Sequence, residues 1–233
     1  MPPMIDVRPF ESLGHAQHGW LNARRHFSFA DYYDPGRMGW GAIRVWNDDT
    51  IAAKNGFPPH PHRDMEIITY VREGAISHKD SMGNEGRTAA GDVQVMSAGS
   101  GVVHAEYNLE DEDTTLFQIW VQTDHKGAAP GWGMQPFPKE DRDGAFQLLA
   151  SGDPDDGSLT IQADARVLGA TVKPGGELRY AADPMRHQYL VPSGNVRVNG
   201  VAAGPRDGVA ITGEDEIRIE ADSDAEIVLV DAR

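Results

Sequence analysis

Short β-forming runs separated by glycine and proline recur along all 233 residues, and this pattern constrains the fold more than any other feature. The chain contains 26 Gly and 15 Pro, which are spread throughout and not gathered in one linker. Many runs alternate or are rich in Val, Ile, Thr and Tyr, as β-strands are. The clearest runs are residues 42–46, 66–72, 92–96, 116–122, 159–163, 188–192, 208–212, 216–220 and 226–230. No long stretch has the 3.6-residue period of a helix, so we expect an all-β barrel or sandwich.

Two segments of the chain repeat the same order of runs and turns. Residues 70–107 and residues 189–222 both read as strand, tight turn, strand, Gly/Asp turn, strand, turn and strand. In each copy a pair of Gly and Asp precedes an apolar run, at Gly91–Asp92 and at Asp207–Gly208. A repeat of this kind indicates that the chain builds the same barrel twice.

A turn-rich and charged region lies between the two copies. Residues 133–157 include GMQPFPKEDRDG and SGDPDDG, which favour turns over strands. We therefore predict an N-terminal lobe of residues 1–140 and a C-terminal lobe of residues 141–233. Each lobe then has roughly the 100 residues of a small β domain.

The charge and the lack of cysteine exclude several classes of function. The formal net charge is −15 at pH 7, and such an acidic protein repels a phosphate backbone, so we expect no direct binding to nucleic acid. Without Cys the chain has no disulfide, no thiolate metal ligand and no Cys nucleophile. No apolar run reaches the length of a signal peptide or the roughly 20 residues of a membrane span. We expect a cytoplasmic protein that does not associate with membranes.

Two pairs of potential metal ligands stand out, each with one residue between its members. His60 and His62 lie in GFPPHPHRDMEIITYVREG, and His104 and Glu106 lie in GSGVVHAEYN. Residues i and i+2 of a strand point to the same face, so each pair can reach one ion. Two such strands facing each other inside a barrel would supply four ligands, and imidazole with carboxylate suits first-row divalent metals. Taken alone, either pair is also compatible with an ordinary surface pair.

The C-terminal copy of the repeat lacks this set of ligands. It contains Arg186–His187–Gln188 and the acidic run at residues 216–220, but no His-x-His and no His-x-Glu. We therefore expect one metal site, in the N-terminal lobe only.

The remaining histidines and two polar residues of the motifs receive simpler interpretations. We expect His26 to be a hydrogen-bonded strand residue and His78, beside Lys79, to lie on a surface loop. Glu66 is expected to orient an imidazole and not to bind the metal, and Asn108 either does likewise or ends its strand. The histidines expected on the surface are His15, His18, His125 and His187.

The motifs around these ligands resemble those of the cupin superfamily, and in detail those of its pirin branch. The cupin motifs have the forms G-x5-H-x-H-x3-4-E-x6-G and G-x5-P-x-G-x2-H-x3-N. The matching residues are Gly56, His60, His62, Glu66, Gly74, Gly91, Gly99, Gly101, His104 and Asn108. The chain departs from these forms in a shorter first gap, one extra residue before Gly74, and an SAGSG turn without the proline. Those departures match the pirin pattern, as do DSMGN, MSAGSGVVHAE and LFQIWV, and the run HGWLNARRHFSFADYYDP resembles bacterial pirin-like proteins.

The resemblance, which covers nearly the whole chain, implies a fold and a ligand set. The fold is a bicupin of two jelly-roll-like β-barrel lobes. In pirins the glutamate of the first motif is not a ligand, and the fourth ligand is the glutamate two residues after the third histidine. Carried over, the ligands are His60, His62, His104 and Glu106. They would hold one divalent metal, for which we expect Fe(II), although such ligands also accept Ni, Cu, Co, Mn and Zn.

Pirins similar to this chain are linked to quercetin 2,3-dioxygenase activity, which opens a flavonol ring with O2 and releases carbon monoxide. The resemblance therefore implies a flavonol-like substrate, with Glu106 as general base toward its hydroxyl group. Phe57, Met65 and Trp120 are candidate walls of the substrate pocket. Two alternatives stay open: a redox-responsive regulator that binds a partner protein without catalysis, and a metal that only stabilises the lobe. We expect a monomer.

Overall fold

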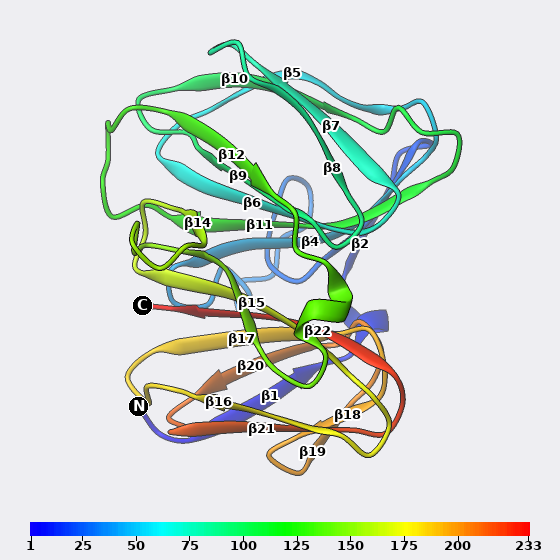
Figure 1. The fold of residues 1–233 in the computed structure, drawn as a ribbon, viewed down its shortest axis with the longest axis vertical. Coiled ribbons are helices and arrows are strands. Elements are labelled where there is room, and N and C mark those ends of the chain that lie inside the picture. Colours follow the sequence, from blue (N-terminus) through cyan, green and yellow to red (C-terminus); the bar gives the residue numbers. More distant parts are fainter.

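A computed structural model describes residues 1–233 and shows a chain built almost entirely of β-strands, arranged as two stacked lobes (Figure 1). The strands before residue 140 are β1 (Met4–Arg8), β2 (Gly14–Gln17), β3 (Leu21–Arg25), β4 (Ile43–Ile51), β5 (Gly56–His62), β6 (Met65–Glu73), β7 (Ala75–Asp80), β8 (Glu85–Ala89), β9 (Val93–Ser97), β10 (Val102–Tyr107), β11 (Thr114–Gln122) and β12 (Gly131–Gln135). The strands after it are β13 (Gln147–Ser151), β14 (Leu159–Thr160), β15 (Ala165–Val172), β16 (Glu177–Ala181), β17 (His187–Pro192), β18 (Val196–Val198), β19 (Val201–Ala203), β20 (Gly208–Thr212), β21 (Glu216–Ala221) and β22 (Ala225–Ala232). The expected all-β bicupin fold is confirmed.

The only helices are two short 3-10 turns, η1 (Phe10–Ser12) and η2 (Lys139–Arg142). With three and four residues, neither is long enough to span a bilayer. One expected strand is also much shorter than its sequence suggests. Within residues 159–163 only Leu159 and Thr160 form a strand, because the backbone of Gln162 bonds to Asp124 and to the Glu66 side chain and not to β13.

Each lobe consists of one seven-stranded sheet and one four-stranded sheet. In the N-terminal lobe the orders are β12-β9-β6-β11-β4-β3-β2 and β5-β10-β7-β8. In the C-terminal lobe they are β1-β20-β17-β22-β15-β13-β14 and β16-β21-β18-β19. The four-stranded sheets correspond strand for strand, and so do the central strands of the larger ones. The internal repeat seen in the sequence is therefore a repeat of the fold.

The first strand of the chain belongs to the second lobe. β1 pairs with β20 from Met4↔Thr212 to Arg8↔Gly208, and both lie in the lower lobe of Figure 1. β1 thus takes the sheet edge that β12 takes in the N-terminal lobe, where β12 pairs with β9. The N-terminal segment therefore contributes to both lobes, with β1 in the C-terminal lobe and β2 and β3 in the N-terminal lobe. The boundary near residue 140 stays a prediction.

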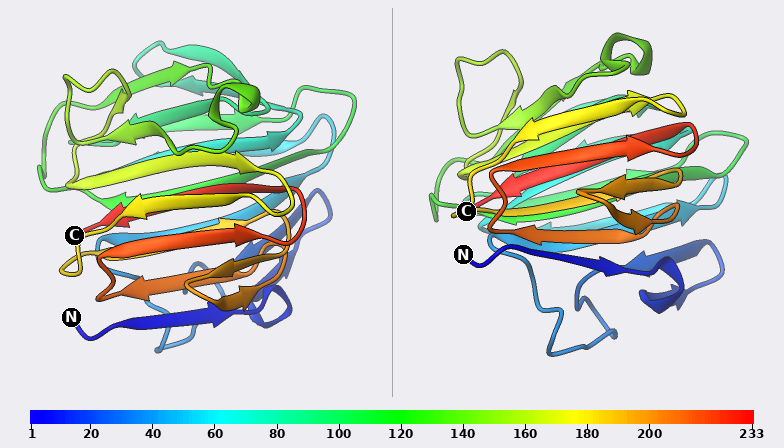
Figure 2. Two further views of the ribbon diagram at one scale, coloured as in Figure 1. Left: turned by 60° about the horizontal axis from the view of Figure 1, so that its bottom comes forward. Right: turned by 90° about the horizontal axis from the view of Figure 1, so that it is seen from below.

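The two seven-stranded sheets pack against each other and form the main core. A cluster of 24 buried residues joins side chains of both sheets, among them Trp46 and Phe117 from one and Tyr189 and Val230 from the other. The interface also contains polar contacts between the lobes, such as His26 Nδ1 with the hydroxyl of Tyr189 at 2.8 Å. The four-stranded sheets therefore form the outer layers, at the top and the bottom of Figure 1, and the lower one comes to the front in the turned views of Figure 2. Each lobe keeps its own interior between its two sheets.

The two interiors differ in chemistry. The inward positions of β16, β18 and β21 carry buried residues of one hydrophobic cluster: Leu178, Tyr180, Val196, Val198, Ile217 and Ile219. The corresponding strands of the N-terminal lobe carry histidine and carboxylate side chains at inward positions. Both groups of possible metal ligands in the structure lie in the N-terminal lobe. That a metal binds in this lobe only stays a prediction.

Candidate metal centre

The two predicted ligand pairs lie on neighbouring strands of one sheet. β5 and β10 are antiparallel partners, with His60 opposite His104 and His62 opposite Val102. The expectation that these strands face each other inside the barrel is therefore wrong, because they lie side by side in one sheet and are joined by hydrogen bonds. The i,i+2 spacing still places the side chains on one face, which is the face toward the lobe interior. A β-bulge lies between His104 and Glu106 and changes the register there.

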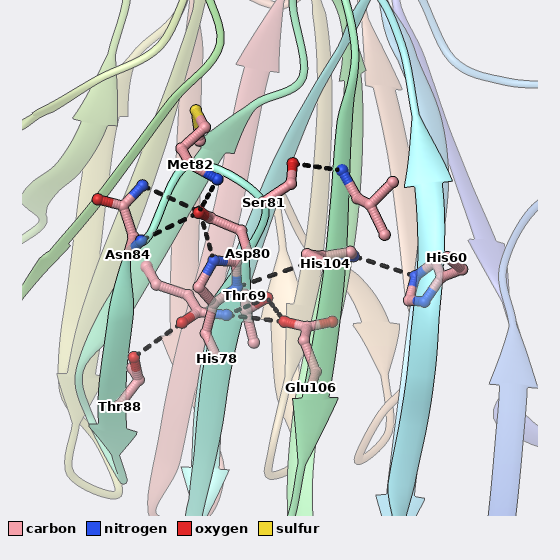
Figure 3. A network of polar contacts seen from close by, with 12 residues as sticks. His60, Thr69, His78, Asp80, Ser81, Met82, Asn84, Thr88, His104 and Glu106 are labelled. Atoms are coloured by element: carbon pink, nitrogen blue, oxygen red, sulfur yellow. Dashed lines mark hydrogen bonds and ion pairs between the residues drawn. The ribbon is translucent and has the colours of Figure 1, made fainter.

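Three imidazole rings converge at this face. The ring centres of His60, His62 and His104 lie 4.5 Å (His60–His104), 4.8 Å (His60–His62) and 4.8 Å (His62–His104) apart. The Nε2 atoms of His60 and His104 are 3.0 Å apart (Figure 3). His60 Nδ1–H donates to the Pro58 carbonyl at 2.7 Å, which leaves the lone pair of its Nε2 directed toward His104. This is the arrangement that a metal-binding set of imidazoles requires.

Burial keeps the imidazoles of His62 and His104 neutral. It lowers the pKa of His104 to about 2, with further lowering by His60, His62 and His78. Burial also lowers the pKa of His62 to about 4, with a smaller contribution from His60. Neutral imidazole is the form that binds metals. The donor set therefore fits a divalent cation with nitrogen ligands.

Glu106 is buried on β10, two residues after His104. Its Oε1 accepts hydrogen bonds from Gln94 Nε2 at 2.7 Å and Thr69 Oγ1 at 3.4 Å, and its Oε2 accepts one from Gln118 Nε2 at 2.9 Å. Burial raises the pKa of Glu106 to about 7, although the three hydrogen bonds oppose that rise.

The potential ligands form two overlapping groups. His60, His62 and His104 form one, and His78, His104 and Glu106 form the other, with the ligand atoms of each group within 4.8 Å of one another. His104 is common to both. The four-residue set of His60, His62, His104 and Glu106 thus stays a prediction, with three members brought together and Glu106 beside His104.

His78 is not the surface residue that its neighbours in the sequence suggested. It is 3% exposed and lies on β7, where its ring stacks on Trp132 with centres 4.9 Å apart and an angle of 11°. Its Nε2–H donates to Asp80 Oδ2 at 2.9 Å, and its Nδ1 lies 3.5 Å from Nδ1 of His104. Asp80 is held by the backbone N–H groups of Met82 and Asn84.

These contacts allow one consistent arrangement of protons, which can be followed in Figure 3. His78 donates to Asp80 from Nε2, so its Nδ1 carries a lone pair. His104 then donates to that lone pair from Nδ1, at the long end of hydrogen-bond distances. The Nε2 of His104 is left with its lone pair toward His60. The pair of Asp80 and His78 therefore fixes the His104 ring with its Nε2 lone pair toward His60, in the way that outer hydrogen-bond partners fix metal ligands.

Substitutions of His78 are expected to separate this role from simple packing. In His78→Asn the amide oxygen lies near the former Nδ1 and still accepts from His104, whereas His78→Gln places its amide nearer Asp80 and loses that acceptor. We expect His78→Gln to weaken metal affinity by roughly 10- to 100-fold and His78→Asn to weaken it less, as measured by competition with a chelator. His26→Asn is the matched control, because His26 is equally buried but contacts Tyr189. Unchanged affinity in His78→Gln would contradict this arrangement.

Glu66 does not have the expected role beside an imidazole. Its carboxylate accepts hydrogen bonds from Ser97 Oγ at 2.6 Å and from the backbone N–H of Gln162 at 3.0 Å. The reason is that Asp64, with φ +49°, ends the extended chain after His62, so Glu66 belongs to β6 in the other sheet. Glu66 thus connects β6 and β9 with the segment between β14 and β15 of the C-terminal lobe.

Asn108 follows the end of its strand and fixes the next turn. Its amide donates to the carbonyls of Ile51 and Glu112, and its Oδ1 accepts from the backbone N–H of Glu110. His26 is hydrogen-bonded as expected but lies just after β3. His15, His18 and His125 are exposed, whereas His187 is half-buried against Trp40.

A cavity of about 390 Å³ lies beside the imidazoles, and His60 and His62 form part of its wall. Its apolar lining includes Phe57 and Trp120, as the sequence predicted, but not Met65, which packs in a separate cluster with Ile67. Such a volume is typical of small-molecule sites, which span roughly 300–1,000 Å³. A larger depression of about 630 Å³ near Asp153 lacks these imidazoles.

Several polar residues of this interior were not identified from the sequence. Asn47 and Asp49 line the cavity, and Gln94 and Gln118 bind Glu106. Burial, followed by the nearby charge of Asp48, raises the pKa of Asp49 to about 8. The sequence feature that could have identified them is a polar residue within an apolar run. Gln94 lies in VQVMS, Gln118 lies in LFQIWV, and Asn47 and Asp49 belong to the run NDD, which has apolar residues before it and Ile51 shortly after it.

The sequence and the fold can be compared with known proteins. A family model described as Pirin matches residues 6–121, and one described as Quercetinase C-terminal cupin domain matches residues 148–232. The Pirin-like protein of Caulobacter vibrioides is 63% identical, over 98% of this chain and 100% of its own length. The quercetin 2,3-dioxygenase of Escherichia coli K12 is 45% identical over 98% of each chain.

Among solved structures, bacterial pirin YhhW from Escherichia coli in complex with nickel(II) superposes with a TM-score of 0.92 at 43% identity. The superposition covers 98% of this chain and 99% of that one. The similarity thus extends over both lobes and nearly the full length of these relatives. The chain belongs to the pirin family of the cupin superfamily.

Proposed function

We propose that this protein is a metal-dependent dioxygenase that cleaves flavonols such as quercetin with O2 and releases carbon monoxide. The observation that carries the proposal is the position of the imidazoles. His60 and His62, partners of the buried His104, form the wall of a cavity of about 390 Å³ with aromatic lining. The 45% identical relative named quercetin 2,3-dioxygenase supports the same reaction.

The ion in this proposal is one divalent cation in the N-terminal lobe, for which we favour Fe(II). Its ligands are His60, His62, His104 and Glu106. When bound, it supplies a Lewis acid that lowers the pKa of the substrate hydroxyl. The hydrogen bond from His60 Nδ1 to Pro58, and the contact of His104 with His78, hold the two Nε2 lone pairs toward the site.

Glu106 takes the proton of the substrate hydroxyl in this proposal. A carboxylate acts as general base when it lies near the proton that it removes and is shielded from water. Glu106 is 2% exposed and adjoins His104 in the second ligand group. The amides of Gln94 and Gln118 fix its two oxygens, so that the carboxylate is oriented before substrate binds.

The cavity binds the flat ring system and keeps water away from it. The Trp120 ring lies edge-on to His62, with centres 5.0 Å apart, and edge-on to Phe29 at 5.2 Å. Its indole N–H donates to Gln118 Oε1 at 3.2 Å, which fixes the ring at this place. An aromatic substrate beside His62 would therefore meet aromatic walls.

The activity is tested by metal analysis followed by turnover. Protein purified without O2 is expected to contain one divalent metal per chain, and with quercetin and air it should consume O2, lose the long-wavelength flavonol band and release carbon monoxide. Metal-free protein should do none of these. If fully metallated protein gives no carbon monoxide with several flavonols and with each of the six metals, the dioxygenase proposal fails. Partner capture under oxidising and reducing conditions would then test the regulator alternative.

A further inference from the structure

The cavity beside the imidazoles has a second polar group that the metal site does not use. Asn47 and Asp49 lie on β4, two residues apart, so both side chains point into the lobe interior. Arg25 lies opposite Asn47 on the neighbouring strand β3, and Ala23 lies opposite Asp49. All four residues line the cavity.

Three buried polar atoms of this group, one from each of Asn47, Asp49 and Arg25, have no hydrogen-bond partner within the protein. Asp49 is 2% exposed and Asn47 is 4% exposed, and the Oδ1 atom of each makes no hydrogen bond. Nε of Arg25 is also buried without a partner. Buried polar atoms are almost always paired, because burying them without a hydrogen bond costs free energy. Three unpaired atoms on one cavity wall indicate a place where a ligand supplies the missing hydrogen bonds.

The charges around the group favour a neutral ligand. The positive charge of Arg25 is offset by Asp31, which pairs with its Nη1, and the same Nη1 donates to the Phe29 carbonyl at 3.0 Å, whereas its Nε has no partner. The unpaired oxygens of Asn47 and Asp49 can accept hydrogen bonds, and an ionised carboxylate or phosphate oxygen has no proton to donate to Asn47 Oδ1. A neutral hydroxyl group suits them, because it can donate to an oxygen and accept from Nε of Arg25.

We propose that Asn47 and Asp49 form a subsite that binds a ring hydroxyl of the substrate other than the 3-hydroxyl. The inference rests on the proposed function and defines its substrate class as flat polyphenols with ring hydroxyls, held between the aromatic walls and this polar pair. A cavity whose polar groups hydrogen-bond a substrate hydroxyl strongly rejects an analogue that lacks this hydroxyl, because the polar groups are then left unpaired. An apolar cavity rejects an analogue with an additional hydroxyl less strongly.

Binding without O2 tests the subsite separately from turnover. The probes are quercetin and 3-hydroxyflavone, which share the three-ring skeleton and the 3-hydroxyl, but 3-hydroxyflavone has no other hydroxyl group. The dissociation constants for the metal-loaded protein are measured by quenching of tryptophan fluorescence. Wild type is expected to bind quercetin about tenfold more tightly or better. Asp49→Leu and Asn47→Leu should each weaken quercetin binding roughly five- to tenfold, as the loss of a hydrogen bond does, and leave 3-hydroxyflavone binding unchanged.

Two further variants keep the test independent of folding defects. Asp49→Asn retains hydrogen-bonding atoms and should keep most of the preference for quercetin. Asp48→Asn is the matched control, because Asp48 is equally buried but lies on the other face of β4, where it pairs with Arg72 and Arg206. It should not change the ratio of the two affinities.

The outcomes separate the subsite from the dioxygenase proposal. Equal affinity of wild type for the two flavonols, or an equal loss for both in Asp49→Leu, overturns the subsite even if quercetin is turned over. A preference for quercetin that Asp49→Leu and Asn47→Leu abolish supports the subsite even if no carbon monoxide is released. Failure of both flavonols to bind overturns the substrate class.

Discussion

Replacement of His104 by Ala is expected to remove most metal binding and to be the most damaging single change at the site. His104 is the only residue shared by the two groups of potential ligands, and its ring contacts His60, His62 and His78. Its loss removes a ligand and the one ring that the other three imidazoles all contact. We expect a loss of affinity greater than the roughly 10- to 100-fold typical of outer hydrogen-bond partners, measured by elemental analysis and chelator competition.

Changes of the other two histidines should act in the same direction. His60→Ala and His62→Ala each remove one imidazole from the group of three. His187→Ala is the control, since His187 lies in the other lobe against Trp40 and should leave the metal content unchanged. Stoichiometric metal in the triple variant of His60, His62 and His104 would place the site elsewhere, and a large loss in His187→Ala would contradict a single site in the N-terminal lobe.

Glu106→Gln is expected to cause the largest loss of activity among changes that preserve size. The side-chain amides of Gln94 and Gln118 each donate to one oxygen of Glu106. A glutamine at position 106 has only one acceptor oxygen, so one of these two amides would face the new NH2 group, which is also a donor. Those two amides cannot simply turn over, because Gln94 Oε1 accepts from Thr88 and Gln118 Oε1 accepts from Trp120. The negative charge and the proton acceptor are lost as well. We expect O2 uptake with quercetin, corrected for bound metal, to fall by roughly 10²- to 10⁴-fold.

Glu66→Gln is the matched control for this experiment. Glu66 is also a buried glutamate, 1% exposed, but its partners are Ser97 and the backbone of Gln162. The substitution should lower thermal stability and leave metal content and turnover per metal close to those of wild type. A loss of turnover as large as that of Glu106→Gln would show that the carboxylate next to His104 has no special role.

The main errors made from the sequence arose where residues distant in the chain decide the environment. His78 stands beside Lys79, Asp80 and Ser81, which indicated a surface loop, yet β10 on one side and Trp132 on the other bury it. Glu66 is four residues after His62, but the turn at Asp64 transfers the chain from one sheet to the other. Neither outcome follows from local spacing.

The sequence by itself determined the features that depend on local geometry. The two-residue period of a strand places His60 with His62 and His104 with Glu106 on common faces, whatever the rest of the chain does. The spaced apolar runs and turns likewise predicted the β fold and its internal repeat.

Only the tertiary structure decided how these faces combine. It joins β5 and β10 side by side, places Glu106 among the amides of Gln94 and Gln118, and leaves Asp49 unpaired on the cavity wall. It also assigns β1 to the C-terminal lobe. Strand pairing and burial are contacts between segments far apart in the chain, so they depend on the whole packed core and not on the spacing of residues along one strand.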